Sequence, residues 1–451
     1  MPNPDTQRTL VCALEGALLK TDLKSERLVN KAKIALERLL SSNLDLYRLR
    51  LERAESKNNS FTLPLNQEVY DFLQKEKSTG RRLLLDTTEP AETVQETLAD
   101  NYLFDATVNL KSGEPVTENF DYVGTSATPN EVWDNAEKHY FVGSEERQTT
   151  GVIRHFATEK ADVKAALKAV RTYQWLKNLL VFVPIITSQQ FGTPGALIHT
   201  IIMFFCFSAV ASFGYVVNDL LDLQADRAHA TKRNRPFASG RLSVMQGIAI
   251  GAVLLILTAV GSLFLPAICS VVLLCYLALT ITYSIYLKTK LMIDIVALGG
   301  LFTLRVIGGA TAIETEMSFY LLSFSIFLFS SLGMVKRFAE LLNQHSRNRL
   351  VARGRGYLVE DMAPVLIIGI SLGYMSVFIM GLYINSPLIT QYYTNPKVIW
   401  LLLPLLTYWL GRLWILAHRG AVNEDPLIFA VKDRTSLLVA GLAAIILFLA
   451  I

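Results

Sequence analysis

Nine apolar segments in the last two thirds of the chain limit most strongly what it can fold into. Each approaches the roughly 20 residues that a helix needs to cross the hydrocarbon core of a bilayer. They cover residues 176–193, 197–217, 243–264, 267–286, 292–312, 318–335, 363–384, 398–417 and 435–451. Backbone polar groups find no water in that core, so each crossing is expected to be a helix. The sequence therefore predicts an all-α polytopic bundle of nine transmembrane helices.

The first 150 residues have a different composition, with charged residues throughout and only short apolar runs. Strand and helix patterns alternate there, which is typical of an α/β domain. Strands are expected at 9–14, 82–86, 106–110, 122–124 and 140–143, with helices such as 66–77 and 91–101 between them. We therefore expect a multidomain protein: a soluble α/β domain at 1–150, a linker and interfacial helix at 151–175, and the membrane domain at 176–451.

Basic residues are distributed unevenly among the connections between the predicted helices. If the first domain is cytoplasmic, the loops on its side are 218–242, 287–291, 336–362 and 418–434. They contain five, two, six and three Lys or Arg residues, whereas the opposite loops contain only Lys397. Basic residues favour the cytoplasmic ends of membrane helices. We therefore expect a multi-pass protein of a bacterial cytoplasmic (inner) membrane, with the first domain inside the cell and the C-terminus outside.

An acidic motif follows the second apolar segment and is itself followed by a basic cluster. It consists of Asn218, Asp219, Asp222 and Asp226. At helical pitch the three aspartates lie on one side, within roughly 60° of one another. Carboxylates, water and phosphate oxygens are the usual ligands of Mg²⁺. The motif therefore predicts a site for a magnesium-bound diphosphate, with the aspartates as metal ligands. The alternative is a solvated loop with scattered acids.

Further candidates for phosphate contacts lie mostly where apolar segments meet the expected cytoplasmic face. Basic side chains bind phosphate through charged hydrogen bonds. The candidates are Arg171, Lys177, Arg235, Tyr283, Lys288, Arg305, Lys336, Arg337 and Glu340. Other charged or polar groups expected on this face are Asp294, Asn423, Glu424, Asp425 and the basic loop through Arg355. This one-sided arrangement favours an enzyme over a transporter, which would need polar residues near mid-membrane.

Simpler interpretations of these candidates stay open. Lys177 and Lys288 could anchor helix ends at the membrane interface. Lys336 could pair with Glu340, four residues later on a helix. Arg305 falls inside an apolar segment, where an arginine is expected to face the bundle interior and often has a function, but it could also be structural.

These motifs resemble the UbiA-type superfamily of intramembrane transferases, whose bundle has nine spans. The superfamily carries an N-D-x-x-D-x-x-x-D motif after the second span, matched here at 218–226. Three other segments resemble the decaprenyl-phosphate phosphoribosyltransferase branch: R-x-x-Q-W-x-K-N at 171–178, K-R-[FY]-A-E-L at 336–341 and D-P-[LV]-x-F-A-x-x-D-R at 425–434. Branches that prenylate aromatic acceptors usually carry a second aspartate-rich motif after the sixth span, which this chain lacks.

The resemblance implies a reaction and its partners. Mg²⁺ and phosphoribosyl diphosphate would bind at the aspartates, and the phosphate of a polyprenyl phosphate would attack the anomeric carbon of ribose. An alternative within the superfamily is transfer of an isoprenoid from a prenyl diphosphate to an aromatic acceptor. A non-catalytic carrier or scaffold is a third interpretation. We expect the chain to lie in a lipid bilayer and to bind no nucleic acid. Whether it forms a homo-oligomer is left open.

The first domain resembles the haloacid dehalogenase (HAD) phosphatases, but its motifs are degenerate. That family needs D-x-D-G-[TV] after the first strand, and here Ala13 and Glu15 stand at the nucleophile and acid/base positions. Thr87 matches the second motif and Lys111 is the candidate for the third, but no acid stands at 124–126 for the fourth. A methyl group cannot form an aspartyl-phosphate. We therefore expect a catalytically inactive domain that serves regulation, docking or stability.

Overall fold

The computed structural model describes residues 8–40, 63–112, 116, 119–143, 152–158, 162–229, 231–346, 356–391, 393–422 and 425–451. The chain divides into two compact units. The first contains Met1–Val170 and Tyr215–Ala252, and the second contains Arg171–Gly214 and Val253–Ile451. The predicted groups Asn423, Glu424 and the basic loop 347–355 lie outside the described residues.

A six-stranded parallel sheet forms the centre of the first unit, in the order β3-β2-β1-β4-β5-β6. The strands are β1 (Thr9–Ala13), β2 (Leu83–Asp86), β3 (Ala106–Val108), β4 (Phe120–Gly124), β5 (His139–Gly143) and β6 (Val152–Ala157). The five predicted strands are confirmed, within a few residues at their ends. β6 is an addition, and it lies in the range that the sequence analysis assigned to a linker.

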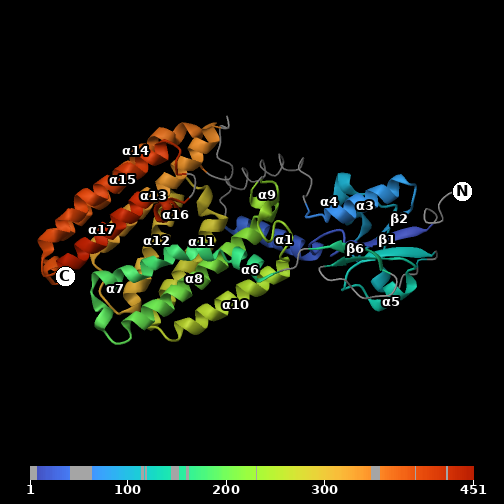
Figure 1. Ribbon diagram of the computed structural model, residues 1–451, viewed down its shortest axis with the longest axis horizontal. Helices are drawn as coiled ribbons and strands as arrows, with labels where there is room; N and C mark the ends of the chain where they lie inside the picture. The colour runs from blue at the N-terminus through green and yellow to red at the C-terminus, as the bar shows by residue number, and fades with distance from the viewer. Residues whose placement is uncertain are drawn as a thin grey trace. The chain divides into compact units, whose positions relative to one another are not determined.

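Helices cover both faces of this sheet, as parallel sheets require. Leu10 and Cys12 of β1 point into one core, together with α3 (Gln67–Ser78) and α4 (Ala91–Leu98). Val11 points into the other core with Trp133 of α5 (Asn130–Asn135). Figure 1 shows α3 and α4 on one side of the strands and α5 on the other. The α/β character predicted for this domain is therefore confirmed.

A separate apolar cluster in the first unit surrounds the acidic motif. α1 (Leu23–Leu40) and α6 (Val163–Ala169) contribute Val29, Ala165 and Ala169 to it. The motif supplies Leu220 and Leu223, from the end of α8 (Ala196–Leu221) and from α9 (Leu223–Arg227). Two helices from outside the predicted membrane domain therefore pack directly on the segment that carries the aspartates.

Long apolar helices make up most of the second unit. Among the described residues, seven helices are long and apolar enough to cross a membrane, or eight if a pair bent by 85° is one span. The seven are α8, α10 (Val244–Ser262), α11 (Ala267–Ile285), α12 (Ile293–Ala312), α13 (Phe319–Ser346), α14 with its first turn (Val359–Ile384) and α15 with its first turns (Pro396–His418); the bent pair is α16 (Pro426–Lys432) and α17 (Arg434–Ala450). The predicted nine are not confirmed in this part of the chain.

The bent pair leaves the last predicted span open, and the first predicted span, 176–193, is missing from both counts. It forms a 3₁₀ segment, η4 (Thr172–Phe182), and a short helix, α7 (Val183–Thr187). This segment packs very closely on α12. A Cβ added at Gly309 would lie 2.0 Å from the Val181 carbonyl oxygen. Glycine at that position therefore allows the two backbones to touch.

Candidate functional site

The acidic motif lies at a break between two helices. Asn218 and Asp219 belong to the last turn of α8, Asp222 lies between the helices, and Asp226 belongs to α9. The backbone stays nearly helical, since the Asp222 amide donates to the Asn218 carbonyl at 2.9 Å and the Asp226 amide to the Asp222 carbonyl at 2.8 Å. Asp219 and Asp226 are buried, whereas Asp222 is partly exposed.

Arg235 joins the two buried aspartates. Its Nη1 donates to Asp219 Oδ1 at 3.0 Å and to Asp226 Oδ2 at 2.6 Å. Asp222 instead lies near α1, with its Oδ1 3.7 Å from Lys33 Nζ. The structure therefore brings together Asp219, Asp226 and Arg235 from the predicted set, and places the third aspartate beside a lysine of the N-terminal domain.

These groups suit magnesium only in combination with a substrate. Among the described residues, no three His, Cys, Asp or Glu side chains are arranged to hold a metal ion. Mg²⁺, however, is usually held by one or two carboxylates together with water and substrate phosphates. Two buried carboxylates that already converge on one cation, Arg235, fit that chemistry.

A second polar cluster gathers residues of the second unit from three distant segments. Lys177 of η4 donates to Asp425, which caps the first turn of α16. Lys336 of α13 interacts electrostatically with both of them and with Tyr283 near the end of α11. Burial opposes ionisation of Asp425, but the two lysines outweigh it, so its pKa lies below the usual range. The three branch-specific motifs of the sequence therefore meet in one place.

Arg337 and Glu340 belong to an ion-pair network around Asp294. Arg337 is fully buried; its Nη1 pairs with Glu340, and its Nη2 lies 2.9 Å from Asp294 Oδ2. The contact with Asp294 is an ion pair without hydrogen-bond alignment. The Tyr357 hydroxyl donates to the other Asp294 oxygen at 2.7 Å. Glu340 therefore pairs with Arg337 at i, i+3 in this structure.

Arg305 holds several helices together in the interior. Its Nε donates to Asn178 Oδ1 at 2.7 Å, its Nη1 to the Leu301 carbonyl at 2.6 Å, and its Nη2 to the Tyr276 hydroxyl at 2.7 Å. Asn178 in turn donates to Ser208 Oγ of α8 at 3.0 Å. The remaining candidates are half-buried: Arg171 precedes η4 in a left-handed conformation, and Lys288 lies in η7 (Leu287–Thr289).

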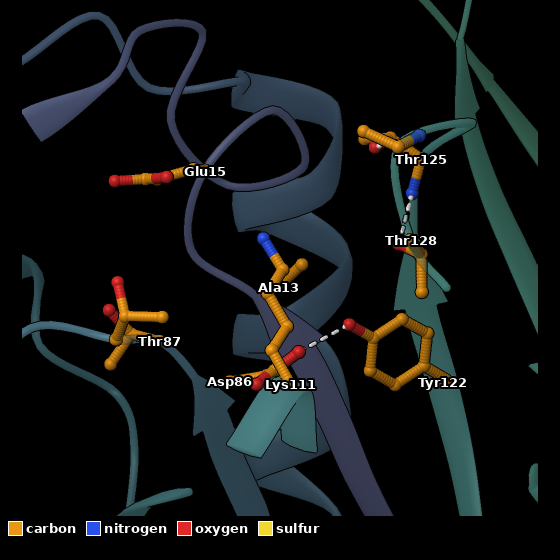
Figure 2. A pocket seen from close by; sticks show the side chains of 10 residues that line it. Ala13, Glu15, Asp86, Thr87, Lys111, Tyr122, Thr125 and Thr128 are labelled. Carbon is orange, nitrogen blue, oxygen red and sulfur yellow. Dashed lines mark hydrogen bonds between the residues drawn. The ribbon is translucent and has the colours of Figure 1, made fainter. Parts of the chain in front are cut away.

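A further pocket lies at the carboxyl edge of the parallel sheet, where the strand order reverses between β1 and β4. This edge is where ligands usually bind to such sheets. Figure 2 shows Ala13, Glu15, Thr87 and Lys111 around it, so the structure groups the residues that the degenerate motifs singled out. Burial, followed by the nearby Asp22 carboxylate, raises the pKa of Glu15 above its usual range.

Asp86 is a carboxylate in this pocket that the sequence analysis missed. It stands on β2 directly beside Ala13 of β1. Its Oδ2 accepts a hydrogen bond from the Tyr122 hydroxyl at 2.6 Å (Figure 2), and its Oδ1 accepts one from the Leu110 amide at 3.0 Å. Both oxygens are therefore held by the fold. The end of a buried strand before Thr87 was the signal that could have drawn attention to it.

Comparison with known proteins adds a family match, two related sequences and a related solved structure. A model of the UbiA prenyltransferase family matches residues 180–430. An uncharacterised protein of Sinorhizobium fredii, y4nM, is 33% identical over 98% of this chain and 90% of its own length. The decaprenyl-phosphate phosphoribosyltransferase of Mycolicibacterium smegmatis is 33% identical over 44% of this chain, and this chain spans 62% of it. A solved UbiA homologue from Archaeoglobus fulgidus, bound to GPP and Mg²⁺, covers 63% of this chain and 99% of its own, with 18% identity and a TM-score of 0.49.

Proposed function

Because this chain belongs to the UbiA prenyltransferase family and is a multi-pass membrane protein, we propose a specific transferase reaction for it. It moves 5-phosphoribose from phosphoribosyl diphosphate to a polyprenyl phosphate. A phosphate oxygen of the lipid forms a bond to the anomeric carbon of ribose, and the bond from that carbon to diphosphate breaks. The observation that carries the proposal is the meeting of Lys177, Lys336 and Asp425, which come from the three segments shared with the phosphoribosyltransferase branch.

The aspartates would bind the donor. Asp219 and Asp226 would hold Mg²⁺ together with the diphosphate, and Asp222 would add a further carboxylate. When bound, the metal would neutralise charge that develops on the leaving diphosphate. Arg235, which bridges the two buried aspartates, is placed to pair with a diphosphate oxygen instead. The fold of the chain would contribute to donor binding by holding two carboxylates within hydrogen-bond distance of one guanidinium.

The lysine cluster would bind an anionic phosphate. Lys177 forms an ion pair with Asp425, and Lys336 interacts electrostatically with Lys177, Asp425 and Glu340, so two basic side chains gather in a largely buried place. A buried positive charge is costly, and a phosphate would supply further negative charge. An acceptor phosphate is already anionic, so its attack on ribose needs no strong general base. Positioning and charge would then account for most of the rate.

Prenyl transfer to an aromatic acceptor is the second candidate, because the family match by itself favours it. The two reactions differ in donor, so one experiment separates them. The purified protein receives Mg²⁺ with labelled phosphoribosyl diphosphate and polyprenyl phosphate, or with labelled prenyl diphosphate and 4-hydroxybenzoate. We expect labelled lipid product only from the first pair. Product only from the second pair would overturn the phosphoribosyl proposal.

We also propose that the N-terminal domain and the aspartates lie on the cytoplasmic side of a bacterial inner membrane. The uneven distribution of Lys and Arg among the connecting loops supports this orientation. A reporter enzyme that is active only outside the cytoplasm, fused after Ile451, should be active. This expectation depends on the nine predicted spans, so an inactive reporter on a stably inserted protein would mean either an even number of spans, as in the count of eight, or the reverse orientation.

A further inference from the structure

One face of α1 contacts the segment that carries the aspartates. Glu26 and Lys33 are seven residues apart, so they lie on the same side of the helix two turns apart. Glu26 forms a two-pronged ion pair with Arg227: Nη1 donates to Oε2 at 2.8 Å and Nη2 to Oε1 at 2.6 Å. Their side chains are only 2% and 6% exposed. Figure 1 shows α1 beside α9, the helix that ends at Arg227.

Arg227 also connects Asp226 to the turn that carries Arg235. It directly follows Asp226 in the chain, and its Nε donates to the Ala238 carbonyl at 3.1 Å. Ala238 belongs to the turn that begins at Arg235, where the Ser239 amide donates to the Arg235 carbonyl at 2.9 Å. The ion pair with Glu26 therefore fixes a residue that holds both the helix of Asp226 and the turn of Arg235.

Apolar packing and a close backbone contact strengthen the same interface. Val29, between Glu26 and Lys33 on α1, packs against the cluster that contains Leu223. Gly240 has a φ of +75°, and a Cβ there would lie 2.7 Å from Cβ of Lys20, just before α1. Only glycine adopts that conformation easily. The N-terminal domain therefore contacts the segment 220–240 through an ion pair, through apolar packing and through the close approach of a glycine turn.

We propose that Glu26 is a positioning residue for the transferase reaction, so that the N-terminal domain completes the metal-diphosphate site. Acting through Arg227, it holds Asp226 and Arg235 in the arrangement that binds a metal and a diphosphate. Lys33 has the opposite effect, because its ammonium group lies close to Asp222 and competes with a bound cation. This inference rests on the metal-binding role proposed for the aspartates.

The test measures metal binding directly, on the full-length protein in detergent. Mn²⁺ replaces Mg²⁺ as an EPR-visible probe, with inorganic diphosphate present. Partners that orient metal ligands typically contribute about 10- to 100-fold to metal affinity, so Glu26→Gln should weaken Mn²⁺ binding by at least about tenfold. Glu68→Gln, which makes the same chemical change at an exposed position of α3, should leave it unchanged. Glu26→Asp, which keeps the carboxylate, should retain more of the affinity than Glu26→Gln.

Lys33→Met separates positioning from a general loss of structure. Removing a nearby ammonium should tighten Mn²⁺ binding, by about threefold for a partly exposed and therefore screened charge. A variant that merely damaged the fold could not bind the metal more tightly. Unchanged Mn²⁺ affinity in both Glu26→Gln and Lys33→Met would overturn the proposal, as would wild-type protein that binds no Mn²⁺. If the wild type binds Mn²⁺ but transfers only prenyl groups, the phosphoribosyl proposal fails and the positioning role of Glu26 stands.

Discussion

Lys177 and Asp425 form an ion pair although 248 residues separate them in the sequence. The pair joins η4 to the first turn of α16, and both side chains are largely buried. An ammonium in such a place attracts an anion, and in the proposed reaction Lys177 would contact the acceptor phosphate.

The first prediction concerns this lysine. Lys177→Met should lower the rate of transfer by about 100-fold or more, which is the usual effect of removing one preorganised charged or hydrogen-bonding group from an active site. The rate is measured as labelled lipid formed per minute by purified protein. Lys397→Met removes an exposed lysine and should leave it unchanged. Equal rates for the two variants would exclude Lys177 from the site.

A second prediction concerns the aspartates and the metal. Asp219→Ala and Asp222→Ala should each abolish turnover while the protein still inserts in the membrane, and a metal chelator should do the same reversibly to the wild type. Asp134→Ala, at an exposed position of α5, serves as the control. Substantial turnover by either of the first two variants would mean that the metal site lies elsewhere.

The third prediction tests the close contact between η4 and α12. Gly309→Ala should lower the melting temperature in detergent, because overpacking at a tight contact typically costs about 1–3 kcal/mol or more. Gly300→Ala on the same helix makes a useful comparison, since its Cβ would meet only Leu279 Cδ2, at an ordinary 3.6 Å. A similar melting temperature for both variants would contradict the observed packing.

A fourth prediction concerns pH and the start of α1. The Asp22 carboxylate accepts hydrogen bonds from the Lys24 amide at 3.0 Å and the Ser25 amide at 3.3 Å. Partial burial raises the pKa of Asp22, but the Ser25 hydroxyl, other hydrogen bonds and the backbone amides outweigh it, so the pKa lies below its usual value. A lowered pKa in the folded state means that the ionised group stabilises the fold above about pH 4 and loses that effect as the pH falls further.

Asp22→Ala should therefore speed hydrogen exchange in α1 at pH 7, by the severalfold that loss of about 1 kcal/mol of capping implies. The ratio of variant to wild-type exchange rates should approach one as the pH is lowered through the folded-state pKa. Lys31→Ala, an exposed change on the same helix, should show no such pH dependence. A ratio that stays constant with pH would show that Asp22 does not act through its charge.

The fifth prediction follows from Ala13. The full-length protein should hydrolyse no phosphomonoester such as p-nitrophenyl phosphate, because alanine at this position cannot form a covalent phosphate intermediate. The neighbouring carboxylate of Asp86 is already engaged by Tyr122 and by a backbone amide. Magnesium-dependent hydrolysis that disappears in Asp86→Asn would show that this carboxylate has taken over the chemistry.

The sequence predicted elements well where a local pattern specified them. The five predicted strands of the first domain were found from short apolar runs, and most of the long apolar helices from the length of their apolar segments. β6 was missed because its residues are mostly exposed or partly buried, with only Phe156 buried. The segment 176–193 was expected to be one helix because it is apolar, but Pro184 and the close approach of Val181 to Gly309 favour two shorter pieces.

In the candidate site, too, local sequence patterns revealed some residues, and contacts between distant segments were missed. Residue types and spacing singled out the aspartates and the lysines, because that chemistry is local in the sequence. Contacts between distant segments carried no such signal. Glu26 and Arg227 are 201 residues apart, and neither stands in a motif that suggests the other. Tertiary pairing of this kind follows from the fold of the first unit and could not be predicted from composition or periodicity.

The bridge that Arg235 forms between Asp219 and Asp226 would stabilise the site between two rounds of the proposed transfer reaction. If the aspartates bind a metal and a diphosphate as proposed, the two buried carboxylates would repel each other whenever the site is empty, and the guanidinium of Arg235 would offset that repulsion. Without a bound metal, the segment would then keep its conformation between rounds of transfer. It could bind the next metal and diphosphate without refolding. It could also be synthesised and inserted into the membrane before any metal reaches it, so that magnesium supply would govern activity without governing assembly.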